Sequence, residues 1–376
     1  MHSRSAIVIG AGIVGLATAR ALALRGFAVK VIERSERAVG ASIRNFGMIW
    51  PIGQPAGKMY DRAVRSRDVW KEIAPIAGFW QEPAGSLHLA YRPDEWQVLQ
   101  ELAETFRQEG RPVQLLDSAA VAACSPAVVT EGLLGGLYSR DELIVDPREA
   151  IAALPGYLSE KFGVQFFWGK CASYISGQIV YIGNEEEHAA DLVFVCNGAD
   201  LGTLYPEQFS RLPVTKCKLQ MMRLVTQPGD WRIGPALCGG LSLTHYNSFK
   251  AAPSLPALRQ RYAEEMPDYL RWGIHVMVSQ NGSGELTVGD SHEYGLTHDP
   301  FDREFINRLI LDYLRTFARF RDWSVSGTWN GIYAKLTDGE GDLFFSPEPY
   351  VYIINGLGGA GMTLSFGLAE ELVAGL

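Results

Sequence analysis

The sequence lacks the patterns that mark several large classes of protein. Its five cysteines are odd in number and include no Cys-x-x-Cys pair, which argues against a disulfide framework or a zinc ribbon and favours a reducing cytoplasm. Its seven histidines form no His-Glu-x-x-His motif, so the sequence predicts no metal centre. It also has no internal repeat and no low-complexity segment.

Runs of like charge and long apolar segments are missing as well. The net charge is −8 and no lysine- or arginine-rich run occurs, so neither nucleic acid nor an anionic membrane is an expected partner. The apolar segment 6–24 contains three glycines and Arg20 and precedes no small-residue cleavage site, which argues against a membrane helix or a signal peptide. We therefore expect a soluble, cytoplasmic protein that inserts into no membrane.

A glycine motif near the start of the chain predicts a dinucleotide site. An apolar run typical of a buried strand (6–9) precedes it, and a helix is expected over 13–25. In such motifs the first glycine permits the turn, the second lets the backbone approach a pyrophosphate, and the third allows close helix packing. The second strand ends at an acid suited to a ribose hydroxyl. The residues assigned to the cofactor here are Gly10, Gly12, Ile13, Val14, Gly15, Glu33 and Arg34. The alternatives are a glycine turn without a ligand and Glu33 as a plain surface acid.

Three further segments distinguish FAD from NAD when they are taken together with this motif. Residues 40–47 read GASIRNFG, residues 193–199 read VFVCNGA, and residues 355–363 read NGLGGAGMT. In combination they resemble the glycine oxidase/D-amino-acid oxidase family of FAD-dependent oxidoreductases, and the resemblance extends over residues 5–376.

The resemblance implies that these segments hold the cofactor. The first would lie along the pyrophosphate and the flavin, the second would border the FAD site, and the third would face the pyrimidine edge of the flavin. Backbone N–H groups at a helix start stabilise negative charge on reduced flavin at that edge. The residues so assigned are Ala41, Ser42, Arg44, Asn45, Gly47, Asn197, Gly198, Gly331, Gly358, Gly359, Gly361, Met362 and Thr363. A turn glycine or a helix cap is the alternative for each.

The same resemblance and the order of elements predict an α/β protein of two domains. A chain of 376 residues is longer than a single hydrophobic core usually grows, roughly 250–300 residues. Residues 219–288 contain short strands between loops rich in Gly, Pro, Ser and Asn, which indicates an antiparallel sheet. We assign residues 1–80, 146–215 and 328–376 to a discontinuous Rossmann-type FAD-binding domain. Residues 81–145 and 216–327 form the α+β substrate-binding domain.

The family chemistry implied is transfer of a hydride from the carbon bearing an amine to flavin N5, followed by hydrolysis of the imine and reoxidation by oxygen. Residues 329–338 depart from the family motif W-x-G-x-R-P-x-x-P-D, because Tyr333 replaces the arginine that clamps a substrate carboxylate. Tyrosine cannot offer the planar fork of arginine, so a plain α-amino acid is not expected. Tyr333 resembles the sarcosine oxidase branch, whose flavin is attached through a cysteine two residues earlier. Gly331 stands there, so we expect non-covalent FAD.

Other cations are candidates for binding an anionic group of the substrate. Arg44 lies in the loop expected near the flavin, Lys335 follows Tyr333 by two residues, and Lys216 and Lys218 begin the antiparallel region. The strings GASIRNFGMIWP and KLQMM resemble the family branch associated with phosphonate catabolism, which implies 2-aminoethylphosphonate or its N-methyl form as substrate. A solvated surface position is the alternative for each lysine.

Histidines and aromatic residues complete the candidate site. His275 lies on a strand expected to border it, and His245 and Tyr246 lie in a loop that would cover it. Either histidine could accept a proton from an ammonium substrate, as could His292, and these histidines join Tyr333 as catalytic candidates. Tyr246 and Trp329 are candidates for contact with the substrate, and Trp50 is a candidate pocket wall. The alternatives are an ordinary hydrogen-bonded histidine and a core tryptophan.

The expected activity is FAD-dependent oxidation of a small primary or secondary amine, with oxygen as acceptor. Several alternatives stay open at this point. They are an amino-acid or sarcosine-type oxidase, a flavin dehydrogenase that uses a quinone or a protein as acceptor, an NAD-dependent dehydrogenase, and a non-catalytic flavin-binding module.

Overall fold

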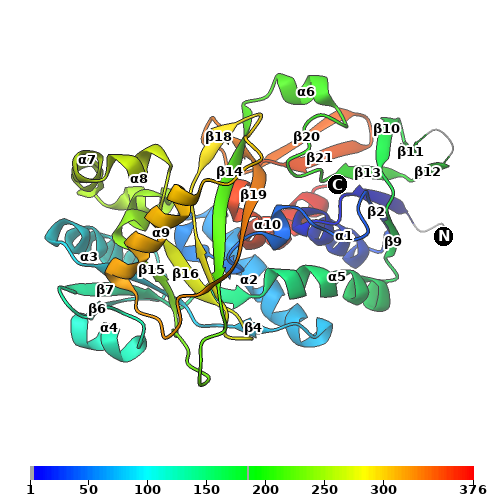
Figure 1. Ribbon diagram of the computed structural model, residues 1–376. Coiled ribbons are helices and arrows are strands. Elements are labelled where there is room, and N and C mark those ends of the chain that lie inside the picture. Colours follow the sequence, from blue (N-terminus) through cyan, green and yellow to red (C-terminus); the bar gives the residue numbers. More distant parts are fainter. Residues whose placement is uncertain (1–3, 184–185) are drawn as a thin grey trace.

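The structure is a computed structural model that describes residues 4–183 and 186–376. A dinucleotide-binding part lies at one end and a second part at the other, and two long strands run between them, β14 (Val214–Leu224) and β19 (Val325–Leu336) (Figure 1). These strands pair with each other along nearly their whole length. They therefore connect the region that holds the glycine loops to the region expected to bind substrate.

A six-stranded sheet forms the centre of the dinucleotide-binding part. Its strands are parallel except for an antiparallel edge strand. The order across the sheet is β20 (Leu343–Glu348), β21 (Val351–Asn355), β13 (Leu192–Val195), β1 (Ser5–Ile9), β2 (Ala28–Glu33) and β9 (Gln165–Trp168). Because β1 is central and covered on both faces, it is a continuous apolar run, as the sequence predicts.

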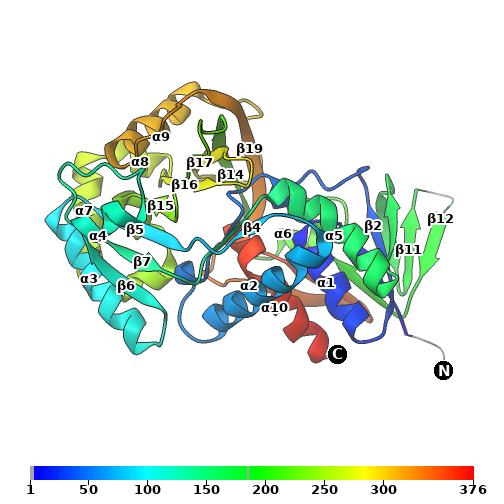
Figure 2. The same ribbon diagram turned by 90° about the horizontal axis from the view of Figure 1, so that it is seen from below.

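Helices cover one face of this sheet and a small antiparallel sheet covers the other. The helices are α1 (Ile13–Leu24), α10 (Gly361–Ala374), α2 (Lys58–Ala77) and α5 (Pro147–Phe162), which lie side by side in Figure 2. The opposite face packs on β10 (Ala172–Ser176), β11 (Ile179–Ile182) and β12 (Glu186–Ala189), with the short helix α6 (Pro206–Ser210). Successive residues of β1 point to opposite faces, so Val8 packs under the helices and Ile7 packs against the small sheet.

The second part contains a nine-stranded, largely antiparallel sheet, which confirms the fold class expected from the sequence. Its path is β18 (Glu293–Gly295), β14, β17 (Leu286–Gly289), β16 (Met277–Gln280), β15 (Ala236–Cys238), β5 (Ser86–Ala90), β7 (Gly135–Ser139) and β6 (Val113–Asp117), with β19 beside β14. Five helices flank it: α3 (Pro93–Gln108), α4 (Ser118–Cys124), α7 (Leu255–Glu265), α8 (Pro267–Arg271) and α9 (Glu304–Phe317). The division of the chain into two domains at the assigned boundaries stays a prediction, since β14 crosses the boundary at 215/216 and β19 the one at 327/328.

Short elements link the two parts. A three-stranded sheet joins β3 (Met48–Ile49), β8 (Leu143–Val145) and β4 (Gln81–Glu82). Five 3₁₀ turns occur in loops of the described chain: η1 (Ala41–Ile43), η2 (Pro51–Gly53), η3 (Gly240–Thr244), η4 (Asn247–Ala251) and η5 (Gly358–Ala360). Within residues 4–183 and 186–376, no helix is both long enough and apolar enough to span a bilayer.

A buried carboxyl group stands between the linking elements and the large sheet. Glu142 is fully buried and accepts hydrogen bonds from the Ile52 backbone N–H (3.0 Å) and the Ser86 hydroxyl (2.9 Å). Burial is the main cause that raises its pKa from 4.5 to about 7. Below about pH 7 the neutral form of Glu142 is therefore favoured in the folded protein.

We expect this group to make stability fall as the pH rises. Its contribution is fully present below about pH 4.5, the ordinary pKa, and is lost as the pH rises through about 7; the difference corresponds to roughly 3 kcal/mol. Glu142→Gln keeps a carbonyl acceptor and cannot ionise, so the thermal midpoint of the variant should exceed that of the wild type at pH 8 but not at pH 4.5. Glu104→Gln, at an exposed position of α3, serves as the control. If the difference in thermal midpoint between wild type and Glu142→Gln were the same at pH 4.5 and pH 8, the assignment would be wrong.

Candidate active site

The first and last glycine loops of the chain meet along one cavity. The start of α1 contributes Gly12, Ile13 and Val14 to its wall, the turn at η1 contributes Ala41, Ser42, Arg44 and Asn45, and the end of β13 leads to Gly198. The start of α10 adds Gly358, Gly359, Gly361, Met362 and Thr363. The structure therefore brings together most of the residues that the sequence assigns to the cofactor, from segments more than 300 positions apart.

The glycines of the first motif are required by close backbone contacts. Gly10 has a φ of +102°, and a Cβ there would lie 2.4 Å from the carbonyl oxygen of Cys196. A Cβ on Gly15 would lie 1.8 Å from the carbonyl oxygen of Gly10. Gly10 and Gly15 shape the turn behind the cavity, and Gly12 forms its wall. This geometry fits a pyrophosphate at the start of α1.

Polar side chains hold the turn at η1 against this helix start. The Ser42 hydroxyl accepts a hydrogen bond from the Ile13 N–H (2.9 Å), and Asn45 accepts one from the Gly47 N–H while its amide donates to the carbonyl of Ala41. Gly47 packs tightly, since a Cβ there would lie 1.9 Å from the Val145 carbonyl oxygen. Ser42 and Asn45 therefore fix the shape of the wall.

Three side chains assigned to the cofactor interact mainly with the protein itself. The Glu33 carboxylate accepts from the N–H groups of Ala11 (2.9 Å) and Ser35 (3.0 Å), beside the glycine turn. Arg34 pairs with Asp200, and Asn197 accepts from the side chain of Asn355. The role of Glu33 toward a ribose stays a prediction. Arg34, Asn197 and Gly47 do not line the cavity, and their contact with the cofactor stays a prediction. Gly10 and Gly15 shape the turn and the helix packing, as the motif predicts.

The cavity continues from the glycine loops to a pocket under β19 and β14. On β19, Gly331, Tyr333 and Lys335 line the wall from one face of the strand, and Ala334 between them also borders the cavity. Tyr333 lies next to the loop expected to face the flavin, because a Cβ on Gly359 would be 3.5 Å from the Tyr333 hydroxyl oxygen. Burial is the main cause that raises the pKa of Tyr333 well above its ordinary value, so its hydroxyl stays protonated and can donate.

The prediction that Lys218 binds substrate is corrected by the same alternation. Leu219 and Met221 of β14 line the cavity, so Lys218 points to the opposite face of the strand. Its ammonium group is buried there and donates to the carbonyl groups of Asp299 and Phe301, each at 2.8 Å.

Trp329 also lies outside the cavity wall, which corrects its assignment to the substrate. Its indole N–H donates to the carbonyl of Arg44 at 3.2 Å. The guanidinium of Arg44 donates to the carbonyl groups of Val39 and Asn330, so it holds the loop even though the residue borders the cavity. Among the described residues, the Lys335 ammonium contacts Tyr294, with a 3.1 Å hydrogen bond to its hydroxyl and 4.9 Å to its ring centroid, and Lys335 remains the better placed cation.

Three histidines and one aspartate gather at the far wall of the pocket. His245 follows η3, His275 precedes β16, and Asp290 and His292 follow β17; all four line the cavity together with Tyr246 and Trp50. The rings of His245 and His275 stack with their centroids 3.7 Å apart. Sequence reasoning named each histidine alone but missed Asp290 and the cluster, because the residues are far apart in the chain and no spacing motif relates them.

Burial governs the protonation of this cluster. Removal from water, and then the neighbouring His292 and Lys335, hold the pKa of His275 well below its ordinary value. Burial likewise lowers the pKa of His245 and brings that of His292 to about 4, and it raises the pKa of Asp290. The three imidazoles are therefore neutral at neutral pH.

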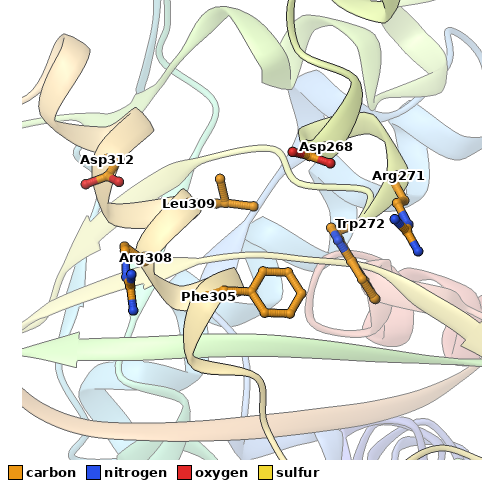
Figure 3. Close-up of a pocket in the computed structure, with 7 residues that line it drawn as sticks. All are labelled: Asp268, Arg271, Trp272, Phe305, Arg308, Leu309 and Asp312. Carbon is orange, nitrogen blue, oxygen red and sulfur yellow. The ribbon is translucent and has the colours of Figure 1, made fainter.

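A second pocket lies on the outside of the large sheet, between α8 and α9 (Figure 3). Trp272 and Phe305 face each other across it with ring centroids 5.4 Å apart, and two arginines and two aspartates surround them. It shares none of its lining residues with the cavity at the glycine loops. We therefore assign the chemistry to the cavity at the glycine loops, which contains the histidines and Tyr333.

The fold and this cavity define a dinucleotide-binding oxidoreductase, and comparison with known proteins gives the family. Residues 5–374 match the family model described as FAD dependent oxidoreductase (DAO), so the chain belongs to this family and its cofactor is FAD. This confirms the family named from the sequence motifs. The residues of the cradle fit the cofactor, and attachment without a covalent bond stays a prediction supported by Gly331.

Solved structures of low sequence identity share the fold over almost the whole chain. Glycine oxidase from Geobacillus kaustophilus superposes with a TM-score of 0.77 at 19% identity, covering 100% of this chain and 95% of that one. L-proline dehydrogenase from P. horikoshii has a TM-score of 0.77 at 20% identity, covering 99% and 92%. Iminodiacetate oxidase from Chelativorans sp. BNC1 has a TM-score of 0.73 at 19% identity, covering 98% and 94%.

Curated relatives match over part of their length. The tRNA 5-methylaminomethyl-2-thiouridine biosynthesis bifunctional protein MnmC of Chromobacterium violaceum is 28% identical over 63% of this chain and 36% of its own length. The bifunctional protein ThiO/ThiG of Nostoc sp. is 29% identical over 59% of this chain and 34% of its own. The aligned region thus spans about a third of the length of these relatives.

We expect Gly15→Ala to prevent stable retention of FAD. The added methyl group cannot fit 1.8 Å from the Gly10 carbonyl oxygen, so α1 must move away from the turn that approaches the pyrophosphate. Gly156→Ala is the matched control, because Gly156 is also helical, in α5, and has open space around its Cβ position. Flavin absorbance per chain after gel filtration measures the effect. Full flavin content in Gly15→Ala would contradict this account of the cradle.

Proposed function

We propose that this protein oxidises a small amine that carries an anionic group, with oxygen as the final electron acceptor. Bound FAD supplies the hydride acceptor, N5 of the flavin ring. The observation that carries the proposal is the continuous cavity that joins the glycine cradle to a pocket containing Tyr333, Lys335 and neutral histidines. The amine gives an imine, and water converts the imine to a carbonyl compound and free ammonia or methylamine.

The cations of the pocket support an anionic substrate other than a plain α-amino acid. Of the described residues that line the cavity, Arg44 and Lys335 carry positive charge, and the guanidinium of Arg44 is already bonded to backbone carbonyl groups. Lys335 can leave the Tyr294 hydroxyl and act as a compact point charge, which suits a phosphonate. We therefore propose 2-aminoethylphosphonate or its N-methyl form as substrate.

The pocket also offers groups that handle the proton of the substrate. An amine must lose its ammonium proton before its carbon can release a hydride, and a neutral imidazole can accept that proton. We propose His245 or His275 for this role and the Tyr333 hydroxyl as a donor that orients the substrate. Tyr246, whose hydroxyl lies 3.1 Å from the sulfur of Met277, forms the wall on the side of Trp50.

The names of the structural neighbours support an amine as substrate and keep two alternatives in view. Glycine oxidase and iminodiacetate oxidase are oxidases by name, whereas L-proline dehydrogenase is named as a dehydrogenase. An amino-acid or sarcosine-type oxidase and a flavin dehydrogenase with a quinone or protein acceptor are therefore the alternatives.

Anaerobic reduction of the flavin by a panel of amines tests the proposal. The panel contains 2-aminoethylphosphonate, its N-methyl form, glycine, sarcosine and ethylamine. We expect the two phosphonates to bleach the flavin fastest, and admission of air to release one hydrogen peroxide per turnover. Faster reduction by glycine or sarcosine would reject the phosphonate assignment, and reduction without peroxide would favour the dehydrogenase.

Removal of the Lys335 charge tests its role. In Lys335→Met we expect the concentration of 2-aminoethylphosphonate for half-maximal flavin reduction to rise about tenfold or more, the loss of roughly 1.4 kcal/mol of binding. Reduction by ethylamine, which has no anion, should change little. Lys216→Met is the matched control, because Lys216 lies on the neighbouring strand outside the cavity wall. An equal effect on both amines would show that Lys335 does not bind the anion.

A further inference from the structure

In the cluster at the far wall, hydrogen-bond acceptors of the histidines and of Asp290 face one another. The Nδ1 atom of His292 lies 2.9 Å from the carbonyl oxygen of Gly273. A carbonyl can only accept, so Nδ1 carries the proton and Nε2 is left with a lone pair. That lone pair faces a carboxyl group, because Nε2 of His292 lies 3.8 Å from Oδ2 of Asp290. A backbone carbonyl that fixes the orientation of a histidine in this way is typical of a metal ligand.

Asp290 and His275 add buried polar atoms without partners. Oδ1 of Asp290 lies 3.0 Å from Nε2 of His275, yet neither Oδ1 nor the other ring nitrogen of His275 has a hydrogen-bond partner among the described residues. Both residues are 4% exposed. Buried polar atoms are normally satisfied, and an ion between Asp290 and His275 would give Oδ1 of Asp290 a partner while it contacts Nε2 of His275.

The spacing suits a small cation. The coordinating atoms of His245, His275 and His292 all lie within 4.8 Å of one another. Ligand atoms about 2.0–2.1 Å from a tetrahedral zinc ion are separated by roughly 3.3 Å. The contacts of 3.0 Å and 3.8 Å from Asp290 to the two histidines bracket that value, so small side-chain movements would close the site.

We propose that His275, His292 and Asp290 bind a divalent transition-metal cation, such as Zn²⁺, whose remaining positions open into the cavity. Two imidazoles and one carboxylate with open positions are the ligand arrangement of catalytic zinc sites. A cation fits this group of side chains better than an anion does, because an anion here would face the Asp290 carboxyl group. A buried carboxylate, in contrast, is stabilised by a bound cation.

The open positions of the cation offer a binding site for the substrate, an inference that rests on the proposed function. A phosphonate oxygen could occupy an open position of the cation while the amine lies toward Tyr333. His275 would then act as a ligand, which leaves His245 to accept the proton. His245 suits this role because it lines the cavity beside His275, with the two ring centroids 3.7 Å apart.

Zinc binding to the holoenzyme tests the site. The purified yellow protein is treated with a chelator, dialysed and titrated with ZnCl₂ by calorimetry, and bound zinc is counted by mass spectrometry. We expect one zinc per chain with micromolar affinity or tighter, and affinity weakened on the order of 100-fold in His292→Ala and Asp290→Asn. His188→Gln, far from the cavity on β12, should bind zinc as the wild type does.

X-ray absorption at the zinc edge of the wild type provides a second measurement that needs no variant to fold. It should show two imidazole ligands and oxygen. Absence of zinc binding by the wild type, unchanged binding in both variants, or a coordination shell without imidazole would overturn the proposal. Flavin reduction by the amine panel is measured separately on chelated and reloaded protein. If the protein binds zinc here but neither phosphonate reduces its flavin, the metal site is confirmed and the proposed substrate is wrong.

Discussion

The structure depends on how closely the backbone of α1 approaches the first glycine turn. The space between Gly15 and the carbonyl of Gly10 excludes any side chain, and Gly10 is itself held against the carbonyl of Cys196 at the end of the neighbouring strand. This packing aims the start of α1 along the cavity, and the start of α10 reaches the same cavity from the other end of the chain. Two helix starts thus border one elongated cavity, an arrangement suited to a negatively charged cofactor.

The alternation of side chains on two paired strands then decides which charged residues border the cavity. On β19 this alternation directs Tyr333 and Lys335 into the cavity. On β14 it directs Lys218 away from the cavity, toward backbone carbonyl oxygens. A lysine in this position stabilises the loop 299–303 and cannot reach a substrate. Lys335 therefore belongs to the site and Lys218 to the framework, because successive side chains of a strand point to opposite faces of the sheet.

The histidine cluster shows how the large sheet contributes chemistry of its own. Three loops at the ends of separate elements bring His245, His275, His292 and Asp290 to one wall, where removal from water keeps the imidazoles neutral. Neutral imidazoles can accept protons or bind cations, and both proposed roles of this wall rest on that property.

Much of the dinucleotide cradle follows from the sequence, because its signals are local: a buried strand, glycines at fixed offsets and a helix start lie within one short segment, and similar glycine patterns mark the other loops. The identity of Tyr333 was also enough to argue against a carboxylate clamp. Tertiary structure alone decided that Lys218 faces away from the pocket, that Trp329 packs on Arg44 beyond the cavity wall, and that Asp290 stands among three histidines. The reason is that strand pairing and register are set by long-range packing between segments far apart in the chain, whereas the glycine turn is determined by the steric limits of its own backbone.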